Sequence, residues 1–74
     1  MMPLALVSPN SRVKVIAVHG GHGFCQRLAA MGILPGAELT LVRSALGGPV
    51  IVDVGGGRII IGHGMAHKIL VEPI

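Results

Sequence analysis

Glycine, proline or a charged residue interrupts every apolar run of this 74-residue chain, and this pattern restricts its fold more than any other feature. Twelve glycines and five prolines leave only short segments rich in Val, Ile and Leu between them. Segments of this kind are typical of β-strands. They are too short for a membrane-spanning helix, which needs about 18 or more apolar residues in a row. The sequence therefore predicts a mainly β protein.

Alternation within these runs separates an apolar face from a mixed one. Five strands are predicted, at residues 12–18, 38–43, 50–54, 58–62 and 68–72. Successive side chains of a strand point to opposite faces, so one parity of each run should line the core. That uncharged set consists of Val13, Val15, Leu39, Leu41, Val50, Val52, Val54, Ile59, Ile61, Ile69 and Val71.

The opposite face of the predicted sheet carries charged and apolar residues together. Its charged members are Arg12, Lys14, Glu38, Asp53, Arg58 and Glu72, and its apolar members are Ile16, Val18, Val42, Ile51, Ile60 and Leu70. A contiguous exposed apolar surface usually marks a contact with another molecule. We therefore expect docking to another protein or self-association.

The segments between the strands predict a closed antiparallel barrel. Three glycines in VDVGGGRII supply the positive φ values of a tight hairpin turn, and SALGGP joins the two strands before it. Short strands in a near-continuous meander fit a small five-stranded SH3-like barrel, whose closure removes the edges of the sheet. Residues 1–74 are expected to form one such domain.

The segment FCQRLAAMGILPG, residues 24–36, predicts the one convincing helix of the chain. The helix is expected over about residues 23–31, between the first two predicted strands. Its apolar face would consist of Phe24, Leu28 and Met31. Gly32 stands where a left-handed residue ends a helix, and Ile33 would then pack back on Leu28. The helix is expected to cover one end of the barrel.

Composition limits the partners and the location of the protein. Six basic and three acidic residues give a net charge of +3, but the basic residues are scattered, and the chain has one Phe and no Tyr or Trp. Nucleic-acid binding is therefore not expected, because base stacking needs aromatic side chains. One cysteine, Cys25, excludes an internal disulfide, and the N-terminus does not resemble a signal peptide. A cytoplasmic protein without direct membrane insertion is expected.

Histidine and cysteine are the candidate metal ligands. His19, His22 and Cys25 lie around the start of the predicted helix, and His63 and His67 have the spacing that places two imidazoles on one face of a helical turn. Surface histidines and a structural thiol are the alternative interpretation. The partial glycine motif GGHG favours a flexible connection over a phosphate site. The three carboxylates are isolated, so no catalytic site and no enzyme is predicted.

The order and spacing of several motifs resemble those of the ferrous-iron transport protein A (FeoA) family over roughly residues 4–72. The motifs are Arg27-Leu28, Met31-Gly32-Ile33, Pro35-Gly36, Pro49-Val50, GRIIIG at 57–62, and Ala66 ahead of Ile69 and Val71. The resemblance implies a cytoplasmic SH3-like barrel related to the C-terminal domain of iron-dependent repressors. It also implies a free-standing, non-enzymatic partner of FeoB, the membrane ferrous-iron transporter that has a cytoplasmic GTPase domain.

Two functions are therefore expected from the sequence. The first is an accessory protein that binds the cytoplasmic part of FeoB and modulates iron uptake, with Arg27, Met31, Ile51, Ile60 and Leu70 as candidate contact residues. The alternative is a transition-metal-binding regulatory module, in which His19, His22, Cys25, His63 and His67 are the candidate ligands. No cofactor is required by the first function, whereas the second would bind Fe(II) or Zn(II).

Overall fold

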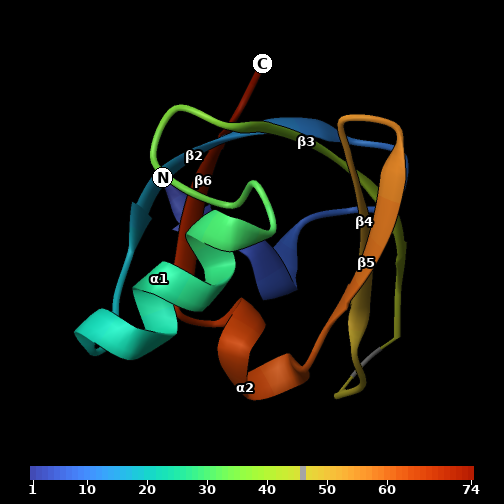
Figure 1. Cartoon of the computed structure of the whole chain (residues 1–74). Coiled ribbons are helices and arrows are strands. Elements are labelled where there is room, and N and C mark those ends of the chain that lie inside the picture. The colour runs from blue at the N-terminus through green and yellow to red at the C-terminus, as the bar shows by residue number, and fades with distance from the viewer. Residues whose placement is uncertain (46) are drawn as a thin grey trace.

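The computed structural model describes residues 1–45 and 47–74 (Figure 1). Its elements in chain order are β1 (Met2–Pro3), the 3₁₀ turn η1 (Leu4–Leu6), β2 (Arg12–Val18), α1 (His22–Ala30), β3 (Glu38–Ser44), β4 (Val50–Val54), β5 (Gly57–Ile61), α2 (His63–Ala66) and β6 (Ile69–Pro73). The five predicted strands are each present to within one residue at either end. The short strand β1, the turn η1 and the one-turn helix α2 are additions, because the sequence predicted a single helix.

All strands belong to one antiparallel sheet of order β1-β6-β2-β3-β4-β5, which curls around the core (Figure 1). Among the described residues, β1 pairs only with β6 and β5 only with β4, so these two strands form the edges of a curled sheet of six strands, one more than the sequence predicts. The strand β1 is two residues long and contains Pro3, a residue type that is found on edge strands because it has no N–H to donate.

The core consists of the inward parity of the strands together with residues from the connections. Nine of the eleven predicted core residues are buried, while Val54 and Ile59 are half-buried and pack against the core. Five further residues complete it, and they come from η1, the segment after it, α1, the turn after α1, and α2: Leu4, Val7, Leu28, Ile33 and Ala66. These lie outside the predicted strands, where alternation gives no signal.

Two β-bulges account for three of the six apolar residues on the predicted outer face, Ile16, Val18 and Val42. The register of β2 against β6 shifts between Val15 and Ala17, so that Val18 pairs with the buried Ile69. A second shift in β3, between Leu41 and Arg43, leaves Val42 as the extra residue. Because a bulge adds one residue to one strand, it reverses the parity beyond it. Of the six apolar residues on the predicted outer face, only Ile60 is exposed, and the other five are half-buried.

The predicted hairpin between β4 and β5 is present. Gly55 and Gly56 have φ values of 60° and 87°, as a two-residue turn of the I′ type requires. The Asp53 carboxylate oxygen Oδ1 accepts a hydrogen bond from the Gly56 N–H at 3.0 Å and closes the turn. The predicted SALGGP connection contains Leu46, which lies outside the described residues. No helix among the described residues combines the length and the apolar character that crossing a membrane requires.

Candidate functional site

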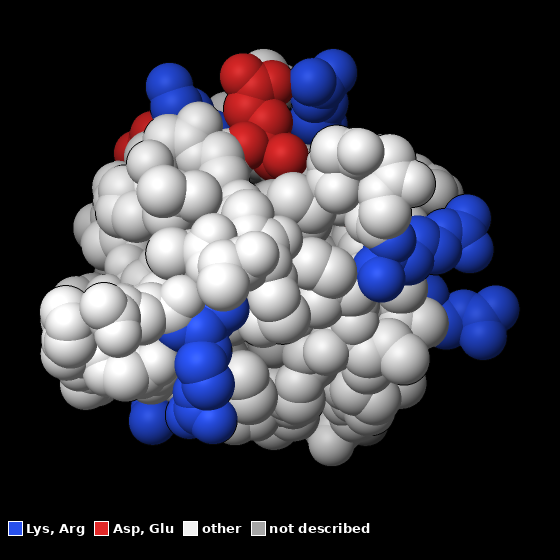
Figure 2. Space-filling model, viewed as in Figure 1, with Lys and Arg blue, Asp and Glu red and all other residues white. Residues whose placement is uncertain are grey.

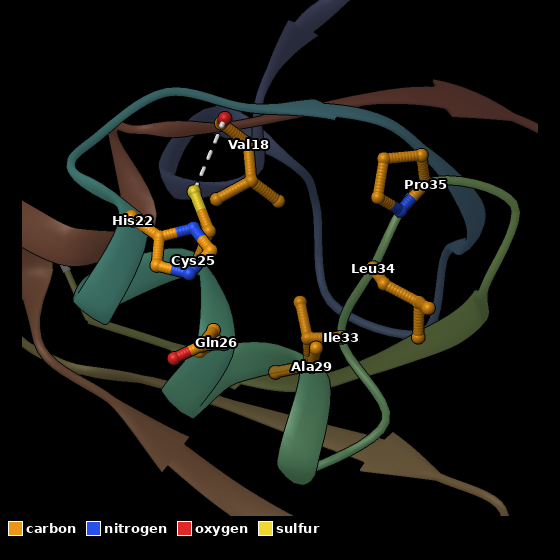
Figure 3. A pocket seen from close by; sticks show the side chains of 8 residues that line it. All are labelled: Val18, His22, Cys25, Gln26, Ala29, Ile33, Leu34 and Pro35. Atoms are coloured by element: carbon orange, nitrogen blue, oxygen red, sulfur yellow. Dashed lines mark hydrogen bonds between the residues drawn. The ribbon is translucent and has the colours of Figure 1, made fainter.

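An apolar groove runs between α1, the end of β2 and the turn that leads into β3 (Figure 3). It encloses about 330 Å³ and is lined by Val18, His22, Cys25, Gln26, Ala29, Ile33, Leu34 and Pro35. We call it the α1 groove. Carbon atoms dominate its walls, and the His22 imidazole, the Cys25 thiol and the Gln26 amide are the polar groups that line it. Such a surface suits an apolar side chain better than a charged substrate.

The end of α1 positions one wall of this groove. The Gly32 N–H donates to the Ala29 carbonyl at 2.9 Å and the Ile33 N–H donates to the Leu28 carbonyl at 2.8 Å, which is the pair of bonds of a Schellman motif. Gly32 adopts φ +87°, and Leu28 and Ile33 are both fully buried. The predicted cap is therefore confirmed. Because Ile33 is fixed in the core, the next residue, Leu34, is held at the surface with 44% of its area exposed.

Met31 does not occupy the place that the sequence predicts for it. It was expected beside Phe24 and Leu28 on the buried face of the helix, but it is the C-cap residue and is 40% exposed. Its φ and ψ of −93° and 4° depart from helical values, so its side chain leaves the apolar stripe. Ile33 takes the core position instead.

Cys25 is a half-buried thiol held by backbone acceptors. Its Sγ lies 3.8 Å from the Val18 carbonyl oxygen and 3.7 Å from the Gly20 carbonyl oxygen, so the thiol donates to the chain that enters the helix (Figure 3). This arrangement ties α1 to the end of β2. It agrees with the interpretation of Cys25 as a structural thiol.

The structure distributes the candidate metal ligands over two places. His22 and Cys25 both line the α1 groove, whereas His19 is exposed and is not among the lining residues. His63 and His67 lie on and directly after α2, with their Nε2 atoms 3.1 Å apart. No cluster of three or more His, Cys, Asp or Glu side chains suited to a metal ion occurs among the described residues.

The candidate contact residues fall into three groups. Arg27 and Met31 are exposed on α1 and at its end, and neither residue lines the groove. Ile51 and Ile60 are cross-strand partners on β4 and β5, and Ile60 is 70% exposed. Leu70 is half-buried on β6, opposite Pro3 and Ala17, and is therefore separated from the Ile51–Ile60 pair by β2 and β3.

Several groove residues were not identified from the sequence. Gln26, Ala29 and Leu34 have no chemistry that distinguishes them, and only the groove geometry brings them together. The exposure of Leu34 could have been predicted from its position. It lies between the core residue Ile33 and the Pro35-Gly36 turn, and turns of this kind lie at the surface.

Charge lies at the edges of the face that carries α1. Figure 2, viewed as Figure 1, shows a largely uncharged centre with Lys and Arg side chains around it and acidic side chains gathered at the top. The one salt bridge among the described residues joins Arg12 and Glu38 at 2.9 Å, and both side chains are about half exposed or more. Exposed pairs of this kind contribute little, about 1 kcal/mol or less.

A small curled antiparallel β-sheet with a helix and an apolar groove at one end defines a small domain of SH3-like architecture. The comparisons with known proteins give the family. The family model of the FeoA domain matches residues 2–73, so the chain belongs to the FeoA family.

Individual relatives agree with this assignment. A candidate Fe(2+) transport protein A of Methanocaldococcus jannaschii is 43% identical over 72 residues, which cover 97% of this chain and 87% of the relative. The crystal structure of an iron uptake regulatory protein (FeoA) is 37% identical with a TM-score of 0.92, covering 99% of this chain and 97% of that chain.

Two further structures place the fold. A zinc-complexed FeoA of Stenotrophomonas maltophilia, described as an SH3 domain protein, is 25% identical with a TM-score of 0.81, covering 97% of this chain and 91% of that chain. The protein IdeR of T. acidophilum is 22% identical with a TM-score of 0.84, covering 99% of this chain and 34% of that chain, and this likeness shows the fold alone. The predicted SH3-like fold is confirmed.

Proposed function

We propose that this FeoA-family protein is a cytoplasmic, non-enzymatic accessory protein of ferrous-iron uptake, and that it acts by binding the cytoplasmic part of the FeoB transporter. Membership of the FeoA family supports the link to ferrous-iron transport. The α1 groove is the observation that carries the binding role. It offers an open apolar cleft of about 330 Å³ in a chain that presents no assembled catalytic site among its described residues.

The groove is built by the segment on which the family resemblance rests most strongly. Residues 24–36 contain three of the six motifs that resemble the FeoA family and six of the eight residues that line the groove. A segment that served folding alone would need only the buried Leu28 and Ile33 and the cap between them. The exposed Leu34 and Ala29 beside them are explained by a partner that covers them.

The charge of α1 and of the whole chain indicates which kind of transporter segment would bind in the groove. The helix α1 contains Arg27 but no acidic residue, and the whole chain carries +3. Arg27 is exposed and has no salt bridge among the described residues. The occupant is therefore a segment of the transporter's cytoplasmic part that places an apolar side chain in the groove and an acidic side chain near Arg27.

A two-dimensional NMR titration tests this proposal. The ¹⁵N-labelled full chain is titrated with the cytoplasmic domain of the FeoB from the same organism. Chemical-shift changes are expected at α1 and at residues 33–36, and Arg27→Glu is expected to weaken binding and reduce its salt dependence. Arg43→Glu, a charge reversal at an exposed position of β3 that lies outside the groove and pairs with the uncharged Ile51, is the control. The absence of any shift at about millimolar partner would contradict the proposal.

A further inference from the structure

Two histidines lie against each other on the surface at α2. The Nε2 atoms of His63 and His67 are 3.1 Å apart, and the two rings meet edge to face with their centroids 4.5 Å apart. Both residues are exposed. We propose that this pair is a two-ligand site for a divalent transition-metal ion, which both Nε2 atoms coordinate.

The separation of the two nitrogens matches what one metal ion requires. Two nitrogens that each lie about 2.0–2.1 Å from a tetrahedral ion are about 3.3 Å apart, and adjacent positions of an octahedral ion are about 3.0 Å apart. The observed 3.1 Å lies between these values. Without metal, one ring donates an N–H to the other ring across this distance. When the ion binds, it takes the place of that proton between the two nitrogens.

The backbone holds the two residues in this arrangement. The His67 N–H donates to the His63 carbonyl at 3.2 Å, and the Ala66 N–H donates to the Gly62 carbonyl at 2.9 Å. Ala66 is fully buried, and the strands on either side begin or end in the core at Ile61 and Ile69. Because the turn is anchored at its centre and at both ends, binding needs to order only the two exposed rings.

The chemistry of the pair defines the class of ion. Imidazole nitrogen suits Zn(II), Cu(II), Ni(II) and Fe(II), whereas Mg(II) and Ca(II) prefer oxygen ligands. No third His, Cys, Asp or Glu joins the pair among the described residues, so water completes the coordination and the ion exchanges readily. The site would give this accessory protein a metal-dependent state, in line with the alternative function expected from the sequence.

Calorimetric titration of the metal-free full chain with Ni(II) or Zn(II) alone tests the site. One ion is expected to bind per chain, with Cu(II) and Ni(II) binding more tightly than Fe(II) and no binding of Mg(II). His63→Ala and His67→Ala are each expected to lose binding, while His19→Ala, which removes an exposed histidine outside both the pair and the α1 groove, binds as the unmodified chain does. Paramagnetic Ni(II) is expected to broaden NMR signals around residues 62–69.

Two results would overturn the site: no binding up to about 1 mM metal, or binding by His63→Ala and His67→Ala at the affinity of the unmodified chain. Both side chains are exposed, so these variants should fold, and their NMR spectra without metal check this. The titration contains no transporter. Its failure therefore leaves the proposed binding of FeoB untouched.

Discussion

At the residue scale, Gly32 combines two constraints that few positions of the chain share. Its φ is +87°, in the left-handed region that disfavours other L-residues. A Cβ atom at this position would lie 3.0 Å from Val54 Cγ1, at the start of the β4–β5 hairpin. The glycine therefore ends α1 and at the same time allows the turn after the helix to approach β4 closely.

Gly32→Ala is expected to lower the free energy of unfolding by about 1–2 kcal/mol through the backbone alone, and further through the contact with Val54. Gly36→Ala is the matched control, because Gly36 has φ +95° and a Cβ atom there would meet nothing within 4 Å. Urea denaturation measures both. An equal loss of stability in the two variants would mean that the contact with Val54 has no cost.

At the element scale, α1 shows what periodicity can and cannot predict. The helix, its Schellman cap and the burial of Leu28 follow from apolar spacing and a glycine in the C′ position, which are local properties. The exposure of Met31 does not follow, because it depends on where the helix ends and not on the spacing. Element boundaries are set by the competition between the cap and one more helical turn.

In the strands too, local features could be predicted from the sequence and features that depend on other elements could not. Each predicted strand is present, because alternating β-branched residues carry a local signal. The bulges at Ile16 and Val42 were not predicted, since they depend on the register between two strands. The groove was not predicted either, because its lining comes from β2, α1 and the following turn. The His63–His67 spacing could be read directly, since it lies within one turn.

Leu28 and Met31 both have the spacing of a buried helix face, but only Leu28 is buried, so their substitutions should differ in the loss of stability. Leu28→Ala is expected to lower the free energy of unfolding by about 2–5 kcal/mol, since it leaves a cavity beneath α1. Met31→Ala is expected to cost less than about 1 kcal/mol, since its side chain is 40% exposed. Urea denaturation with unchanged m-values tests this pair. Similar losses in the two variants would place Met31 in the core and contradict the structure.

At the scale of the whole molecule, one curled sheet supports two separate surface features. The α1 groove is apolar and lies at the end of β2, whereas the histidine pair lies at α2 between β5 and β6. The chain after α2 is joined to the start of α1, because the His19 N–H donates to the Lys68 carbonyl at 2.8 Å and the Lys68 ammonium lies 5.4 Å from the centre of the Phe24 ring. The fold thus presents its groove on a helix that is fixed at both ends.

The central claim is that the α1 groove receives the cytoplasmic part of FeoB, and two adjacent alanines test it most directly. Ala29 and Ala30 are both exposed on α1, but only Ala29 lines the groove. Arginine is a good helix former, so Ala29→Arg and Ala30→Arg should be similarly stable and carry the same added charge.

The measurement is the dissociation constant of each variant for the FeoB cytoplasmic domain. We expect Ala29→Arg to weaken binding about tenfold or more, which is about 1.4 kcal/mol, because its side chain fills the groove. Ala30→Arg should bind as the unmodified chain does. Equal affinities for the two variants, whether both unchanged or both weakened, would contradict the assignment of the groove as the docking site.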